Sequence, residues 1–210
     1  MVRRRVRIRF RKQGDLRLIG HRDLVRAWER LFRRAGVGLR MSEGFHPKPR
    51  MSFPSALAMG VSGADEVLEV ELADETDAEG LAAVLQRHAP AGLEITAAEL
   101  RPPGEGPSQA RRVTFELPVP PERRARLAER LIDWQTEDSH AVDRGNGRKP
   151  VDLGAFVERL ELADDGVLRM HIRVTRQGTA RPRELLESLG LEDLEQCGIY
   201  LTRTAVELET

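Results

Sequence analysis

The N-terminus alternates between apolar and basic residues in a way that leaves few folds open. Val6, Ile8 and Phe10 occupy even positions, and arginines occupy the odd positions from 3 to 11. Successive side chains of a β-strand point to opposite faces, so this period of two predicts a half-buried strand. We expect a strand over residues 2–11 with an apolar inner face and a positively charged outer face.

An amphipathic helix is predicted next, over residues 24–35, with Gly36 at its end. Its apolar residues are Leu24, Val25, Trp28, Leu31, Phe32 and Ala35. Four arginines fall within an arc of about 80° on the opposite side: Arg22, Arg26, Arg30 and Arg33. Glu29 is the only acid on that face. A solvated helix face usually mixes charges of both signs, so this arginine stripe is the most specific signal in the chain.

The order of the predicted elements indicates an α+β protein. The first half reads as strand, helix, a loop over 39–53, strand after 60–63, helix 81–88 and strand 93–100. The second half reads as strand 113–119, helix 121–134, strands 157–162 and 167–174, helix 182–189 and strand 199–208. Both orders resemble βαββαβ. We therefore expect tandem ferredoxin-like units with antiparallel sheets: domains 1–100 and 111–210, joined by a Pro/Gly-rich linker over 101–110.

Charge is balanced overall but segregated along the sequence. The chain has 34 basic and 34 acidic residues. Residues 1–50 contain 16 Lys/Arg and 4 Asp/Glu, whereas residues 65–100 contain 10 Asp/Glu and 1 Arg. One interpretation is a basic surface that binds an anionic partner such as RNA. The other is that the acidic strands neutralise the basic ones within the fold.

A turn-rich segment provides a second candidate contact with nucleic acid. Pro47 and Pro49 forbid a helix there. Nearby lie Phe45, His46, Lys48, Arg50 and Phe53. A basic and aromatic mixture of this kind can stack a base and pair with its phosphate. Alternatively, both phenylalanine rings lie in the core beneath the loop.

Basic residues in the second half suggest two further contacts. Arg181 stands at a predicted helix start, where backbone N–H groups favour anions. Arg144, Arg148 and Lys149 surround a Gly-Asn-Gly turn and could form a second basic loop, although a solvated turn is the simpler interpretation.

Several classes of protein are excluded by what the sequence lacks. Its single cysteine, Cys197, cannot form an internal disulfide or an all-cysteine metal site. No apolar run approaches the roughly 20 residues that span a bilayer, and no secretory signal is evident. No phosphate-binding loop, metal-ligand spacing or cofactor motif is present. We therefore expect a cytoplasmic protein without a metal or a cofactor, and without membrane contact.

Three stretches resemble a known family, the uncharacterised radical-SAM-associated domain: residues 17–24, residues 29–36 and the Ser42–Pro49 loop. The similarity extends to residues 57–61, 65–68 and 178–182 and to the helix that follows. Members occur alone, beside a radical-SAM gene or fused behind a radical-SAM module. The resemblance implies a separate radical-SAM protein as partner, because one cysteine cannot supply the cluster-binding triad of such an enzyme.

We expect a binding protein rather than an enzyme: an accessory protein that holds a structured RNA, such as a tRNA, for the radical-SAM partner. The expected RNA contacts are Arg7, Arg9, Arg22, Arg26, Arg30, Arg33, Phe45, His46, Lys48, Arg50 and Arg181. One alternative is a subunit that docks on the radical-SAM enzyme without contacting RNA. Another is a metal-independent endoribonuclease that uses His21 or His46, since the tandem ferredoxin-like order is similar to that of CRISPR RNA-processing nucleases.

Overall fold

The structure, a computed structural model, describes residues 4–73, 78–145 and 150–209. The chain divides into two compact units, Met1–Gln109 with Leu208–Thr210, and Ala110–Glu207. Both units mix helices with mostly antiparallel strands, so the α+β class is confirmed.

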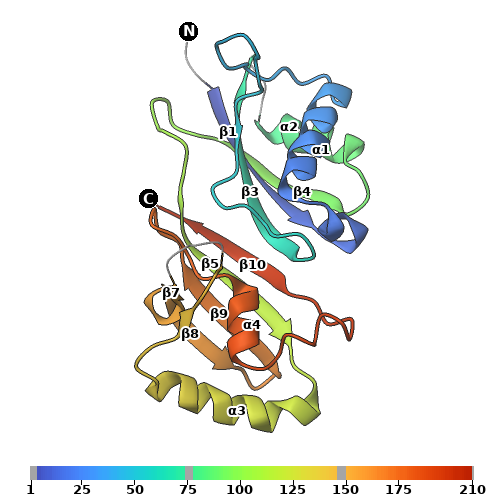
Figure 1. The fold of residues 1–210 in the computed structure, drawn as a ribbon. Helices are drawn as coiled ribbons and strands as arrows, with labels where there is room; N and C mark the ends of the chain where they lie inside the picture. The colour runs from blue at the N-terminus through green and yellow to red at the C-terminus, as the bar shows by residue number, and fades with distance from the viewer. Residues whose placement is uncertain (1–3, 74–77, 146–149, 210) are drawn as a thin grey trace. The chain divides into compact units, whose positions relative to one another are not determined.

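The first unit is built around strand β1 (Arg4–Lys12), which lies between β3 (Ser62–Leu72) and β4 (Leu93–Leu100) and is antiparallel to both. A short strand, β2 (Met51–Ser52), pairs with β3. Its helices are the 3₁₀ helix η1 (Gly14–Leu18), α1 (His21–Arg34) and α2 (Ala78–His88). Figure 1 shows α1 and α2 on the same side of the sheet.

The core of this unit lies between the sheet and its helices, on the side that the N-terminal alternation predicts. Val6, Ile8 and Phe10 are fully buried and belong to one cluster with residues of α1. Phe10 and Trp28 meet edge to face, with ring centroids 5.0 Å apart, a favoured aromatic geometry. Because side chains alternate along a strand, the odd-numbered arginines from Arg5 to Arg11 lie on the opposite face of the sheet.

The second unit has the strand order β10-β5-β9-β8, and β9 is antiparallel to both β5 and β8. Its strands are β5 (Ala110–Pro118), β8 (Val157–Leu162), β9 (Val167–Arg173) and β10 (Thr202–Leu208). Its helices are α3 (Pro121–Thr136), η2 (Leu153–Ala155) and α4 (Pro182–Ser188), and a separate pair is formed by β6 (Ala141–Val142) and β7 (Val151–Asp152).

Most predicted elements are present, and the differences lie at their ends. The last strand begins at Thr202 rather than at 199, after Gly198, which adopts φ +83°. The polar stretch before residue 150 contains β6, which the sequence did not predict. Val2 and Arg3, assigned to the first strand, and Arg148 and Lys149 of the second basic loop lie outside the described residues.

Candidate nucleic-acid interface

The outward arginines of β1 are each paired with a carboxylate from a neighbouring strand. The pairs are Arg5–Glu71 at 2.8 Å, Arg7–Glu69 at 3.1 Å, Arg9–Asp65 at 2.5 Å and Arg11–Glu94 at 2.9 Å. Arg5 and Arg7 lie directly opposite Glu71 and Glu69 in the β1–β3 register, where cross-strand charges attract each other. The acidic segment therefore neutralises the positive face of this strand.

The arginine stripe of α1 is largely uncompensated. Arg22, Arg30 and Arg33 are exposed, and no carboxylate within the described part of the chain forms an ion pair with them. Arg26 is paired with Asp23 at 3.3 Å, but both side chains are solvent-exposed, so their attraction is weak and screened by salt. The helix thus presents a positive face, as its sequence predicts.

The two arginine sets do not form one continuous surface through the sheet. The α1 residues Leu24 and Trp28 pack in the core with the even-numbered residues of β1, whereas Arg7 and Arg9 lie on the other face of that strand and are paired there. The expected surface is corrected accordingly: Arg7 and Arg9 are structural ion-pair partners, and the available guanidinium groups are those of α1.

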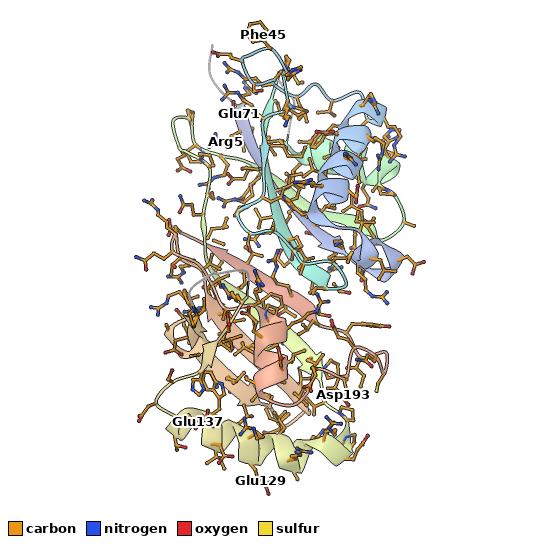
Figure 2. The ribbon with its side chains drawn as sticks, viewed as in Figure 1. Arg5, Phe45, Glu71, Glu129, Glu137 and Asp193 are labelled. Atoms are coloured by element: carbon orange, nitrogen blue, oxygen red, sulfur yellow. The ribbon has the colours of Figure 1, made fainter. Side chains whose placement is uncertain are left out.

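The Ser42–Pro49 segment forms a closed loop that projects Phe45 into solvent. The Ser42 amide donates to the Lys48 carbonyl at 2.8 Å, and the Lys48 amide donates to the Ser42 hydroxyl at 3.0 Å. Gly44 has φ +126°, a conformation that favours glycine. Phe45 is fully exposed, and Figure 2 shows it at the outer end of the loop. His46 and Lys48 are exposed beside it.

Phe53 and Arg50, predicted with this loop, have different surroundings. The Phe53 ring packs against Phe10 at 6.3 Å and against His21 at 5.0 Å, so it belongs to the edge of the core. The Arg50 guanidinium lies 3.8 Å from the Glu71 carboxylate. Of the two phenylalanines, only Phe45 can stack on a partner.

His21, the first residue of α1, is partly buried, and its Nδ1 has no hydrogen-bond partner among the described residues. Burial lowers the pKa of the His21 imidazole below its usual range, and the charge of Lys12 lowers it further. No hydrogen bond in the described chain connects His21 or His46 to a carboxylate that could orient it as a general base. The structure therefore offers little support for catalysis by these histidines.

The His21→Gln variant should lose part of the acid sensitivity of the first unit. Because the folded pKa is depressed, His21 contributes its full stability above its unfolded pKa of about 6.5. As the pH decreases below that value, this stability decreases by at most about 1.4 kcal/mol per pH unit. The decrease ends once the pH is below the folded pKa of His21. Urea unfolding at several pH values between 7 and 5, followed by Trp28 fluorescence, measures the slope of the unfolding free energy against pH. His46→Gln, in the exposed loop, should retain the wild-type slope; an equal change in both variants contradicts the assignment.

A cavity of about 450 Å³ opens on the outward face of the sheet in the first unit. Arg5, Arg50, Glu69 and Glu71 line one part of it, and Pro102 with residues 104–107 line the other. Figure 2 shows Arg5 and Glu71 side by side at this face. The sequence did not predict this cavity, although the alternation of Glu69 and Glu71 along an otherwise buried strand marks the carboxylates that complement β1.

Residues 101–108, predicted as part of a linker, are fastened to the first unit as a strap. Arg5 Nη1 donates to the Glu105 carbonyl at 2.8 Å, and Arg101 forms an ion pair with the Glu105 carboxylate. The amide and the hydroxyl of Ser108 donate to Glu69 at 2.9 and 2.6 Å. Burial alone would raise the pKa of Glu69, but the hydrogen bonds from Ser108 and Arg7 outweigh it and hold that pKa below its usual value.

Arg181, in the second unit, is partly compensated. It is the N-cap residue of α4 and lies 3.7 Å from the carboxylate of Glu184. Glu184 also accepts two hydrogen bonds of 2.7 Å from Arg144, so one member of the predicted second basic loop is structural. Arg181 remains exposed but has an acidic neighbour.

The described segments contain few other groups that could bind a metal ion or react. No cluster of three or more His, Cys, Asp or Glu residues suited to a metal ion occurs there. Cys197 is exposed and free. None of the helices that the structure describes is both long enough and apolar enough to cross a membrane.

Comparisons with known proteins identify a family without a described activity. Residues 5–182 match the family described as "Uncharacterized protein conserved in bacteria (DUF2344)". A search of curated proteins found no match. Among solved structures, the chain is similar to a protein provisionally described as a glycine cleavage system transcriptional repressor. The two share 9% identity over 100% of this chain and 99% of that one, with a TM-score of 0.28. A likeness at that score supports no further conclusion.

Proposed function

We propose that this chain, which belongs to DUF2344, a family of uncharacterised proteins conserved in bacteria, is a cytoplasmic accessory protein that binds structured RNA such as a tRNA. The observation that supports this most is the exposed α1 stripe, in which Arg22, Arg30 and Arg33 have no carboxylate partner within the described residues. Guanidinium groups bind phosphates through paired hydrogen bonds. An RNA backbone is a partner of matching charge.

The 42–49 loop supports the same proposal by a different physical route. Phe45 is a fully exposed aromatic ring beside Lys48. Exposed aromatic rings on RNA-binding proteins stack on unpaired bases, and adjacent cations contact the phosphates. We propose that α1 contacts the backbone, that Phe45, His46 and Lys48 contact a loop or an end of the RNA, and that Arg50 provides a further contact. Arg181 is proposed as a contact from the second unit.

RNA that co-purifies with the protein from its own cells provides the direct test. Ultraviolet crosslinking before purification, followed by sequencing, should recover one structured RNA class above the level recovered with an untagged control. A crosslink mapped to Phe45 by mass spectrometry would identify the stacked base. Recovery of the protein with no enriched RNA would overturn the proposal.

The Phe45→Ala variant should bind its RNA about tenfold more weakly, because stacking of one base on an aromatic ring contributes roughly 1–3 kcal/mol. Its unfolding free energy should stay within about 0.5 kcal/mol of wild type, since the ring is exposed. Fluorescence anisotropy with labelled RNA measures the affinity. Phe45→Trp, which keeps an aromatic face, is the matched control and should bind like wild type. Equal weakening in both variants would count against stacking.

We further propose that the bound RNA is presented to a separate radical-SAM enzyme. The support is the sequence resemblance to radical-SAM-associated domains, together with the single cysteine. Affinity purification with and without nuclease tests this. If the radical-SAM protein is lost on nuclease treatment, RNA bridges the two. If it is retained and no RNA is recovered, the chain is a docking subunit.

A related proposal concerns the fold: each unit is a ferredoxin-like βαββαβ fold. The strand order β4-β1-β3, with β2 beside β3, and the order β10-β5-β9-β8 support it. The residue patterns of the two halves do not repeat, so the proposal depends on topology alone.

A further inference from the structure

Two residues that line the cavity of the first unit each carry a buried polar atom without a hydrogen-bond partner among the described residues. The two atoms are Glu71 Oε2 and Arg50 Nε. The Glu71 side chain is only 6% exposed. Buried polar groups are nearly always hydrogen-bonded, so an unpaired acceptor and an unpaired donor at one cavity point to a missing ligand.

Three neighbouring charged groups already have hydrogen-bond partners. Glu71 Oε1 accepts from Arg5 Nη2 at 2.8 Å. The other guanidinium nitrogen of Arg5 donates to the Glu105 carbonyl, and Glu69 accepts from Arg7 and Ser108. Glu71 Oε2 and Arg50 Nε therefore offer a ligand one acceptor and one donor, beside a network of satisfied hydrogen bonds.

The charges that line the cavity favour a neutral ligand. Two arginines, Arg5 and Arg50, face Glu69, Glu71 and Glu105, and the Glu105 carboxylate is itself paired with Arg101. A bare anion would be repelled by the carboxylates, and a bare cation by the guanidinium groups. A neutral group with one hydrogen-bond acceptor beside one donor matches both unpaired atoms without adding charge.

The size and the walls of the cavity suit a flat heterocycle. Its volume of about 450 Å³ lies within the roughly 300–1,000 Å³ typical of small-molecule sites. Met51, Pro102 and Pro107 supply apolar surface. Gly104 and Gly106 also line the cavity, and a Cβ atom placed on either would meet no other atom within 4 Å.

We propose that this cavity binds a nucleobase, whose Watson–Crick edge presents an acceptor beside an N–H donor. The N–H donates to Glu71 Oε2, and the acceptor receives the Arg50 Nε proton. Arg50 Nη1 lies 3.8 Å from Glu71 Oε2. The Arg50 side chain is 31% exposed, so it has room to rotate and expose the Glu71 carboxylate to the ligand. The inference rests on the proposed function in that the base comes from the bound RNA; the other source of this chemistry is a free nucleotide.

Calorimetric titration of the full chain with the four nucleosides, their monophosphates and short single-stranded RNAs tests the assignment. At least one base should bind as a nucleoside. Glu71→Gln keeps an acceptor for Arg5 but replaces Oε2 with a donor, and it should weaken that binding at least tenfold. Gly106→Leu, which places a side chain in the open space, should abolish it. Thermal unfolding shows whether each variant remains folded, and either folded variant alone decides the question.

The outcomes separate this inference from the proposed function. If RNA binds and nucleosides do not, and both cavity variants keep wild-type RNA affinity, the nucleobase site is wrong and RNA binding stands. If nucleosides bind in a cavity-dependent way and RNA does not, the site stands with a free nucleotide as its ligand. Binding of an amino acid, with no nucleoside binding, would overturn the assignment.

Discussion

Reversing three charges on α1, through Arg22→Glu, Arg30→Glu and Arg33→Glu together, should weaken RNA binding about 100-fold. Each reversal replaces an attraction to phosphate with a repulsion, a net change of about 1 kcal/mol for exposed charges that salt screens. Three reversals therefore amount to about 3 kcal/mol, and 1.4 kcal/mol corresponds to a factor of ten. The variant should stay folded, because all three side chains are exposed and without carboxylate partners in the described residues.

The salt dependence of this variant is as informative as its affinity. Each lost phosphate contact should reduce the slope of log K against log salt by roughly 0.7–0.9, so the triple variant should lose between two and three. Electrophoretic mobility or anisotropy assays at several salt concentrations measure both quantities. An unchanged slope would exclude α1 from the interface even if the affinity fell.

A matched triple variant controls for the change in net charge. Arg111, Arg126 and Arg159 are exposed in the second unit, and their reversal to glutamate alters the charge by the same amount. If α1 provides the interface, this control should retain most of the affinity. Equal losses in the two triple variants would mean that only net charge matters, which would contradict a specific RNA-binding face.

Removing one buried carboxylate should destabilise the first unit by about 3 kcal/mol. Glu69, whose side chain is 1% exposed, pairs with Arg7 and accepts two hydrogen bonds from Ser108. Glu69→Ala leaves the Arg7 guanidinium without its buried partner and releases the strap. Glu99→Ala removes a second carboxylate that pairs with Arg7, one that is 60% exposed, and should cost less than about 1 kcal/mol.

Urea unfolding followed by tryptophan fluorescence measures this difference. Trp28 lies in the core of the first unit, and a Trp134→Phe background removes the other tryptophan of the chain. Because the pKa of Glu69 is lowered in the folded state, its contribution is complete above the unfolded pKa of about 4.3. It is lost as the pH falls through the folded pKa, so the two proteins should converge in strong acid. Similar costs for Glu69→Ala and Glu99→Ala would show that burial does not strengthen this pairing.

The sequence predicts the local features of this protein better than the contacts between distant segments. The alternation at β1 predicts the strand and identifies Val6, Ile8 and Phe10 as core residues, because a strand has only two faces. The arginine stripe of α1 is equally visible, since helical spacing depends on neighbouring residues alone. Both features follow from local geometry and were confirmed.

Contacts between distant segments could not be read in the same way. The pairing of Arg7 with Glu69 depends on the register of two strands that are far apart in sequence. The strap over the cavity depends on hydrogen bonds from Ser108, and its Pro/Gly-rich composition resembles that of any linker. Acidic residues at alternate positions of β3 hinted at compensation, but only the register shows which arginines they satisfy.

The return of the last residues to the first unit has a practical consequence. Leu208–Thr210 belong with Met1–Gln109, and the Glu209 amide donates to the Gln109 carbonyl at 2.8 Å. The second unit is thus an insertion whose entry and exit points are neighbours on the first. Deleting residues 110–207 and bridging Gln109 to Leu208 with a short turn should give a minimal protein that keeps α1, the Phe45 loop and the strap, and would show whether they suffice for RNA binding.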